Sequence, residues 1–217
     1  LLETVDETIA FFRNWLLPVG APAVARALGI SPPAAEAALL DHIRVCFDCC
    51  HMAVEFESAA GALDALSAAG VQIGRVQLSS AVQVTVPRDP AERAALHSRL
   101  RPFADAVYLH QVVAQAPDGP RRFPDLDDAL ACTSECGDEW RVHFHVPLFA
   151  KAFDGLGSTQ AYVADVLARV AEKLLTSHLE IETYTWDVLP DSLKLDVGES
   201  IAREYTWVLD TLDSLRR

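Results

Sequence analysis

The sequence has few cations and no long apolar run. Its 18 Lys and Arg residues are outnumbered by 31 Asp and Glu residues, which gives a formal net charge of −13. Because binding to a phosphate backbone relies on clustered cations, we expect no nucleic-acid partner. No apolar run reaches the roughly 18 residues that a membrane span needs, and no charged-then-apolar leader is visible. These absences predict a cytoplasmic protein without a membrane span.

The common nucleotide-binding signatures are also missing, because neither GxGxxG nor GxxxxGK[ST] follows any predicted strand. An initiator Met is absent as well. The chain opens on LLETVDETIAFFRNWL, which is already in a helical pattern, and we expect a domain that is cut in its middle. With 217 residues that are 51% hydrophobic, the chain is globular and long enough to bury a large core.

The five cysteines are an odd number, and three of them fall at positions 46, 49 and 50, where geometry opposes mutual pairing. We therefore expect reduced thiols. Cys132 and Cys136 are either half of a zinc site or two free cysteines in a loop. Cys49 and Cys50 are either nucleophiles or small buried residues, and the second interpretation is favoured because a reactive thiolate needs an activating base at hand.

Apolar strands alternate with helical segments along the chain, which favours parallel strands with crossover helices and an α/β class. The predicted helices cover 3–17, 20–29, 32–41, 57–69, 89–105, 124–131, 159–175 and 197–214. The predicted strands cover 43–49, 73–79, 106–115, 140–149 and 178–186.

Polar, ligand-type residues recur at the carboxyl ends of these separate strands. They are Asp48 and His51, Gln77 and Ser79, His143 and His145, and Glu180 and Glu182. Residues two apart on a strand share a face, and the alternate positions are mostly apolar, so each strand has one polar face. Since a barrel collects its strand ends at one mouth, where its active site lies, this pattern favours a barrel over an open sheet.

These strand ends resemble the xylose-isomerase-like TIM barrels, a superfamily that includes endonuclease IV and many sugar isomerases and epimerases. The resemblance lies in VCFDCCH at 45–51, HFH at 143–145 and IET at 181–183. With VQLSSA, YLHQVV and HLEIETYTWDVLP added, nearly the whole chain resembles a narrower branch, the EboE-type metabolite-traffic proteins. The resemblance implies that residues 1–217 are the C-terminal half of one (β/α)8 TIM-barrel domain.

The resemblance also implies a site. Its divalent metal ligands would be Asp48, His51, His143, His145 and Glu182, with Glu182 and His145 as catalytic residues and Gln77, His110 and Trp186 as substrate-binding residues. The metal would be Mn, Zn, Fe or Co, which suit oxygen and imidazole ligands. Gln77 stands where the superfamily has a His ligand, and His110 is a candidate substitute. A half barrel would leave two sheet edges unpaired, so we expect pairing with an N-terminal half or with another copy.

Each of these residues also has a structural interpretation. Asp48 is a candidate cap for the turn that follows it, and the histidines are candidate core residues bonded to their neighbours. Glu182 could form a structural ion pair with Arg44, Arg75 or Arg141. Trp186 could pack in the core.

The function that this pattern and the resemblance favour is a metal-dependent isomerase or epimerase that acts on a small sugar-like or polyol metabolite in a metabolite-traffic pathway. The alternative is a non-catalytic metabolite-binding protein that keeps the barrel. A phosphodiester hydrolase like endonuclease IV is disfavoured by the acidic charge.

Overall fold

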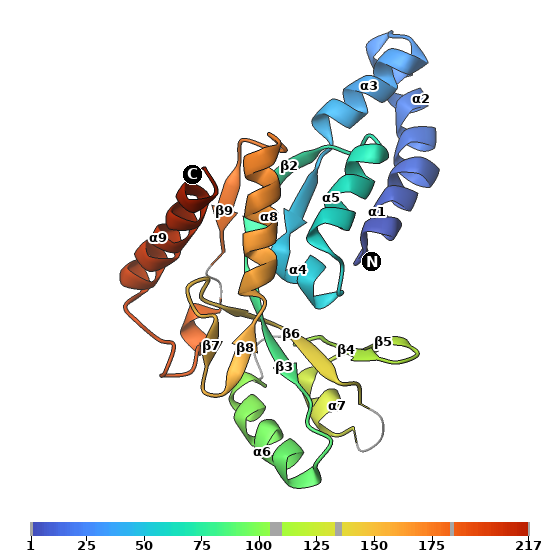
Figure 1. The fold of residues 1–217 in the computed structure, drawn as a ribbon. Coiled ribbons are helices and arrows are strands. Elements are labelled where there is room, and N and C mark those ends of the chain that lie inside the picture. The colour runs from blue at the N-terminus through green and yellow to red at the C-terminus, as the bar shows by residue number, and fades with distance from the viewer. Residues whose placement is uncertain (1, 105–109, 133–135, 183–184, 217) are drawn as a thin grey trace.

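The protein is described here from a computed structural model, which covers residues 2–104, 110–132, 136–182 and 185–216. Two sheets, one parallel and one antiparallel, are arranged along one long axis (Figure 1). Helices cover the parallel sheet, and an arm of helices extends from it at the N-terminus.

The N-terminal arm begins at a capping box in which the Thr4 side chain accepts from the Glu7 amide and Glu7 accepts from the Thr4 amide. Its helices are α1 (Val5–Phe11), the π-helix η1 (Phe12–Gly20), α2 (Ala21–Leu28) and α3 (Pro32–His42). Gly29 ends α2 in the left-handed region, with φ of 65°, and Ser31 caps α3. These helices correspond to the three predicted for the N-terminal segment.

The parallel sheet has the strand order β1-β2-β9. Its strands are β1 (Val45–Asp48), β2 (Ile73–Leu78) and β9 (Leu179–Ile181). Its helices are α4 (Cys49–Val54), α5 (Ala59–Ala68), α8 (Gln160–Glu172) and α9 (Val197–Leu215). Phe47, Val76 and Leu78 are buried in one core with apolar residues of α5 and α8. The other face carries exposed Cys46, Arg75 and Glu180, as the alternation in the sequence predicts.

The antiparallel sheet has the order β5-β4-β6-β3-β8-β7 and a core of its own around Trp140, Val142 and Phe144. Its strands are β3 (Ser80–Thr85), β4 (Val112–Ala116), β5 (Gly119–Phe123), β6 (Glu139–Val146), β7 (Ala152–Phe153) and β8 (Leu156–Ser158). Its helices are α6 (Pro90–Leu100) and α7 (Leu126–Leu130), with single 3-10 turns at Arg101–Phe103 and, after β9, Trp186–Val188.

The two sheets meet at Ser79, where β2 leads directly into β3 (Figure 1). The carboxyl end of β6 pairs with the start of β3, so Val146 lies opposite Ser80 and His145 opposite Ala81. The end of β6 is thereby brought to the carboxyl ends of β1, β2 and β9. This junction is what positions the candidate site.

The expected TIM barrel is wrong for the described part of the chain. Strand 140–149 was predicted to run parallel with the others, but β6 is antiparallel to both β3 and β4. The physical reason is that β3 continues β2 without a crossover helix, and that β4 and β5 form a hairpin across Pro117 and Asp118. Both segments build a second sheet instead of extending the parallel one. The molecule is a mixed α/β fold, with β1 and β9 at the edges of a three-stranded parallel sheet.

The expectation of reduced thiols throughout is also wrong, because Cys132 and Cys136 form a disulfide. Their Cα atoms lie 6.1 Å apart, within the range that a disulfide spans. Cys46, Cys49 and Cys50 are free thiols, as predicted.

Among the described residues, no helix combines the length and the apolarity that crossing a membrane requires.

Candidate functional site

Six of the residues predicted for the site line one small hollow. They are Asp48, His51, Gln77, His143, His145 and Glu182, and the hollow has a volume of about 250 Å³. We call it the polar hollow. Its residues come from the end of β1, the start of α4, β2, β6 and the residue after β9. The structure therefore brings together all five predicted metal ligands and one of the three predicted substrate-binding residues.

Asp48 organises the start of α4. Its Oδ1 accepts hydrogen bonds from the Cys50 amide at 2.9 Å, the His51 amide at 3.3 Å and the Ser79 hydroxyl at 2.7 Å. Its Oδ2 accepts from Gln77 Nε2 at 2.6 Å. This is the helix-capping role that the sequence left open for Asp48, and it fixes where Cys50 and His51 lie.

Gln77 joins the two carboxylates of the hollow. It lies opposite Asp48 in the β1–β2 register, and its Nε2 also donates a hydrogen bond to Glu182 Oε2. The same Glu182 oxygen lies 3.3 Å from His145 Nδ1. One amide therefore sets the positions of both acids.

The two histidines of β6 face each other. His143 and His145 are two residues apart on one strand, so they share a face, and their Nε2 atoms lie 3.3 Å apart. The ring of His51 lies against that of His143, with centroids 4.3 Å apart. Three imidazoles from two elements thus form one continuous cluster.

Burial changes the protonation of this cluster. Burial lowers the pKa of His143 to about 4, with a contribution from the charges of His51 and His110. Burial likewise lowers the pKa of His145 to about 3, with the charges of His143 and His51 acting in the same direction. Burial and the nearby charge of Asp48 raise the pKa of Glu182. Both β6 imidazoles are therefore neutral near pH 7, the form in which imidazole binds metals.

A residue that the sequence-based prediction did not include completes a group with metal-ligating chemistry. Cys50, His143 and His145 each offer one ligand atom, and these atoms lie within 4.8 Å of one another. A thiol and two neutral imidazoles are a donor set that fits a divalent transition metal. The structure thus contains a group of residues able to hold a metal ion, which is the coarse part of the prediction. The sequence favoured Cys50 as a small buried residue, and it is fully buried. A signal was nevertheless present, because Cys50 lies between the predicted ligands Asp48 and His51.

The other two predicted substrate-binding residues lie outside the polar hollow. His110 is fully buried, with its ring stacked on Phe144 at 5.3 Å between centroids. Trp186 donates from Nε1 to the Leu195 carbonyl at 3.0 Å and lines a narrow slit beside the hollow. The slit shares His145 and Glu182 with the hollow.

The same slit contains a residue that the sequence pattern did not reveal. Glu204 of α9 is only 1% exposed, and one of its oxygens accepts from the Leu148 amide at 3.2 Å. Burial raises the pKa of Glu204 to about 7. A lone glutamate on an amphipathic helix carries no sequence signal of this kind, because its burial depends on how α9 packs against α8 and β9 and reaches Leu148.

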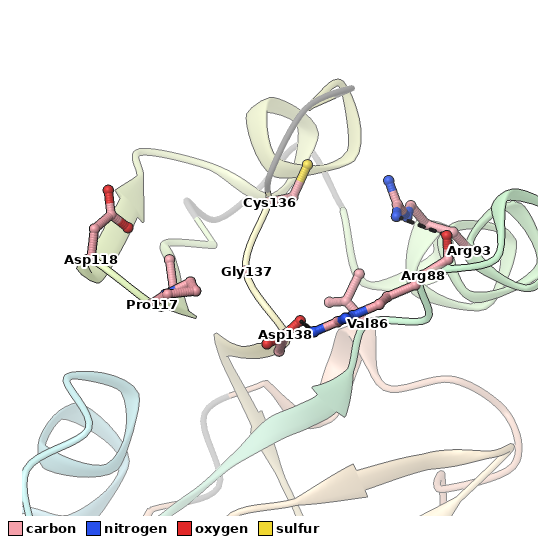
Figure 2. Close-up of a pocket in the computed structure, with 9 residues that line it drawn as sticks. Val86, Arg88, Arg93, Pro117, Asp118, Cys136, Gly137 and Asp138 are labelled. Atoms are coloured by element: carbon pink, nitrogen blue, oxygen red, sulfur yellow. Dashed lines mark hydrogen bonds and ion pairs between the residues drawn. The ribbon is translucent and has the colours of Figure 1, made fainter.

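A larger hollow of about 590 Å³ lies at the opposite ends of β3 and β6 (Figure 2). We call it the distal hollow. Arg88, Arg93, Asp118 and Asp138 line it together with Val86, Ala116, Pro117, Cys136 and Gly137. Arg88 pairs with Asp138 at 3.6 Å, and both side chains are well exposed. Arg88, Asp118 and Asp138 are exposed to solvent, so the distal hollow lacks the desolvated, converging groups of a reactive centre.

Comparison with known protein families, with curated proteins and with solved structures finds no match for this chain.

Proposed function

We propose that the polar hollow is the site of a metal-dependent isomerase or epimerase that acts on a small sugar-like or polyol metabolite. The observation that carries the proposal is the convergence of two acids, three imidazoles and an amide from separate segments on one small hollow. Clustering of perturbed titratable groups in a concave site is typical of catalytic centres. The proposal keeps the cytoplasmic location and the EboE-type resemblance as expectations from the sequence.

The size and lining of the hollow favour a small polar ligand. At about 250 Å³ the hollow falls below the range of roughly 300–1,000 Å³ typical of drug-sized ligands. Its six lining residues offer hydrogen-bond donors and acceptors, which match hydroxyl and carbonyl groups. A short sugar or its polyol relative has this chemistry.

Glu182 is the residue that we expect to move the proton. Its pKa is raised toward neutral pH, which suits a group that both accepts and returns a proton. A proton taken from the carbon beside a carbonyl gives an epimer when a proton is returned to the opposite face of the same carbon. Return to the former carbonyl carbon, with a proton moved from the hydroxyl oxygen to the former carbonyl oxygen, gives an isomer. Neither reaction needs an oxidant or a reductant. A divalent metal supplies a Lewis acid that polarises the carbonyl when it is bound.

The other residues position these groups. Gln77 fixes the positions of Glu182 and Asp48 by donating a hydrogen bond to each. Asp48 caps α4 and so fixes the position of His51. His143 and His145 are the residues that would hold the metal, together with Cys50.

The test is hydrogen exchange from substrate carbon in heavy water. The protein, loaded in turn with Mn, Zn, Fe or Co, is incubated with short aldoses, ketoses and their phosphates, and loss of C–H signals is followed by NMR. We expect exchange with at least one metal, and its loss in Glu182→Gln. Glu180→Gln is the matched control, because Glu180 lies on the exposed face of β9 and pairs with Arg75. Absence of exchange with all four metals would contradict the proposal.

A non-catalytic metabolite-binding role is the second candidate, and one contact favours it. Glu182 Oε2 is engaged by both Gln77 and His145, so one oxygen of the expected base is already occupied. Tight, saturable binding of a sugar or polyol without any carbon-bound exchange would identify this role.

A further inference from the structure

The spacing of the two β6 imidazoles matches the edge of a tetrahedral metal site. Zinc–nitrogen bonds of about 2.0–2.1 Å at a tetrahedral angle place the two nitrogens about 3.3–3.4 Å apart. The Nε2 atoms of His143 and His145 are 3.3 Å apart. A rigid strand thus already holds the two nitrogens at the separation that the ion requires.

The opposite nitrogen of His145 lies beside a carboxylate. Nδ1 is 3.3 Å from Glu182 Oε2, although the two are not aligned as a hydrogen bond. With its proton on Nδ1, on the side of this carboxylate, His145 has its Nε2 lone pair on the side of His143. An imidazole that binds a metal through one nitrogen and donates the other N–H to a carboxylate is a recurrent arrangement around zinc. In this arrangement Glu182 does not bind the ion itself but contacts the ligand His145.

Cys50 supplies the third donor. Its Sγ belongs to the same group as the two imidazoles, within 4.8 Å, and the residue is fully buried. Burial, and then the charge of Asp48, raise the pKa of the Cys50 thiol, so the thiol is neutral when no metal is present. A coordinating cation deprotonates a thiol outright, so burial does not prevent the Cys50 sulfur from binding a metal as the thiolate.

We propose that Cys50 Sγ and the Nε2 atoms of His143 and His145 bind one zinc- or cobalt-type ion at the floor of the polar hollow, with Glu182 orienting His145. The inference rests on the metal-dependent part of the proposed function and narrows its metals, because a thiolate ligand disfavours Mn. Three protein ligands leave a further coordination position, as in catalytic zinc sites. Both imidazoles line the polar hollow, so that position is available to a substrate oxygen.

The test is cobalt binding to the chelator-treated chain, followed by absorption spectroscopy. We expect one Co²⁺ per chain, a thiolate-to-cobalt charge-transfer band in the near ultraviolet, and displacement of cobalt by zinc. Cys50→Ser should abolish the band and weaken zinc binding by at least about 10- to 100-fold. Cys49→Ser is the matched control, since Cys49 is the adjacent, equally buried thiol in another core cluster, and it should keep the band.

Glu182→Gln separates an orienting residue from a ligand. We expect it to keep the charge-transfer band while zinc affinity falls by about 10- to 100-fold, the usual cost of removing an outer partner. Should Cys50→Ser fail to fold, X-ray absorption of the zinc-loaded parent protein should show one sulfur and at least two nitrogens around the metal.

Cobalt binding without a charge-transfer band, or a zinc shell without sulfur, would overturn the assignment of Cys50 and leave a metal-dependent reaction standing. Sulfur ligation without exchange of carbon-bound hydrogen would support the metal site and contradict the proposed isomerase activity. Failure of the parent protein to bind zinc or cobalt would overturn the inference as well.

Discussion

The polar hollow and the distal hollow lie at opposite ends of the same two strands, β3 and β6, and differ in what their side chains face. The distal hollow is more than twice as large, about 590 against 250 Å³, yet its charged side chains are solvated. The polar hollow is lined by one exposed residue, His51, and by five buried or half-buried residues. Burial shifts the pKa of three of these five, His143, His145 and Glu182. The comparison teaches that convergence of desolvated groups indicates chemistry better than volume does.

The largest expected effect is on metal binding. The double substitution His143→Ala and His145→Ala removes two of three donors, and we expect zinc binding to fall to the background measured in the presence of chelator. His97→Ala is a control from the distal half, because His97 is an imidazole that stacks on Trp140 and lies outside the metal group. Zinc measured by mass spectrometry after dialysis checks both. Equal loss of zinc in the two variants would mean that zinc binding does not depend specifically on the imidazoles of the polar hollow.

The second effect concerns stability and pH at the slit behind the polar hollow. Because the folded-state pKa of Glu204 is raised from 4.5 to about 7, the folded state binds this proton more tightly than the unfolded state does. The free energy of unfolding therefore falls as pH rises from about 4.5 through 7, and the loss persists above 7. In Glu204→Gln this loss is absent.

We expect chelator-treated Glu204→Gln to be more stable than the parent at pH 8 by up to about 3 kcal/mol and equal to it near pH 4. Urea unfolding at both pH values measures the difference. Asp210→Asn, an exposed acid on the same helix, is the control and should change little. A Glu204→Gln variant that is less stable than the parent at pH 8 would show that this carboxylate is stabilised when charged.

Local sequence rules predicted the composition of the polar hollow better than they predicted the fold around it. The alternation of polar and apolar residues in β1, β2, β6 and β9 depends only on strand geometry, so it identified which side chains share a face. Position at a strand end then brought Asp48, Gln77, His143 and Glu182 to one place in the structure. The shared face and the strand-end position are the same whether β6 runs parallel or antiparallel to its neighbours.

The fold could not be obtained in the same way, because strand direction depends on the connections. The segment after Ser79 was not predicted as a strand, although β3 continues there, and the hairpin formed by β4 and β5 was read as one strand and a turn. Cys50 was missed because it lies on α4, beyond the strand whose alternation identified the site, and because a buried thiol is by itself typical of packing. The pairing of β3 with β6 helps to bring His143 and His145 beside it.

A third effect compares two helix caps, one in each half. Asp48→Ala removes the cap of α4, leaves the Ser79 hydroxyl without its acceptor and leaves Gln77 Nε2 with Glu182 alone, so we expect a loss of about 2 kcal/mol. Asp89→Ala removes the exposed cap of α6, which accepts from the Ala91 and Glu92 amides, and should cost about 1 kcal/mol. Urea unfolding of both variants measures the two losses. Equal losses would mean that Asp48 acts as a cap alone and that its side-chain partners contribute nothing.

The smallest effect is expected at the distal hollow. Arg88 and Asp138 form an exposed ion pair, and exposed pairs contribute roughly 0–1 kcal/mol because water and salt screen them. Arg88→Ala should therefore change the free energy of unfolding by no more than about 0.5 kcal/mol and should leave zinc affinity unchanged. Calorimetric zinc titration and urea unfolding of this variant measure both quantities. A lowered zinc affinity would show that the two ends of β3 and β6 are energetically coupled, and the distal hollow would then belong to the same functional unit as the polar hollow.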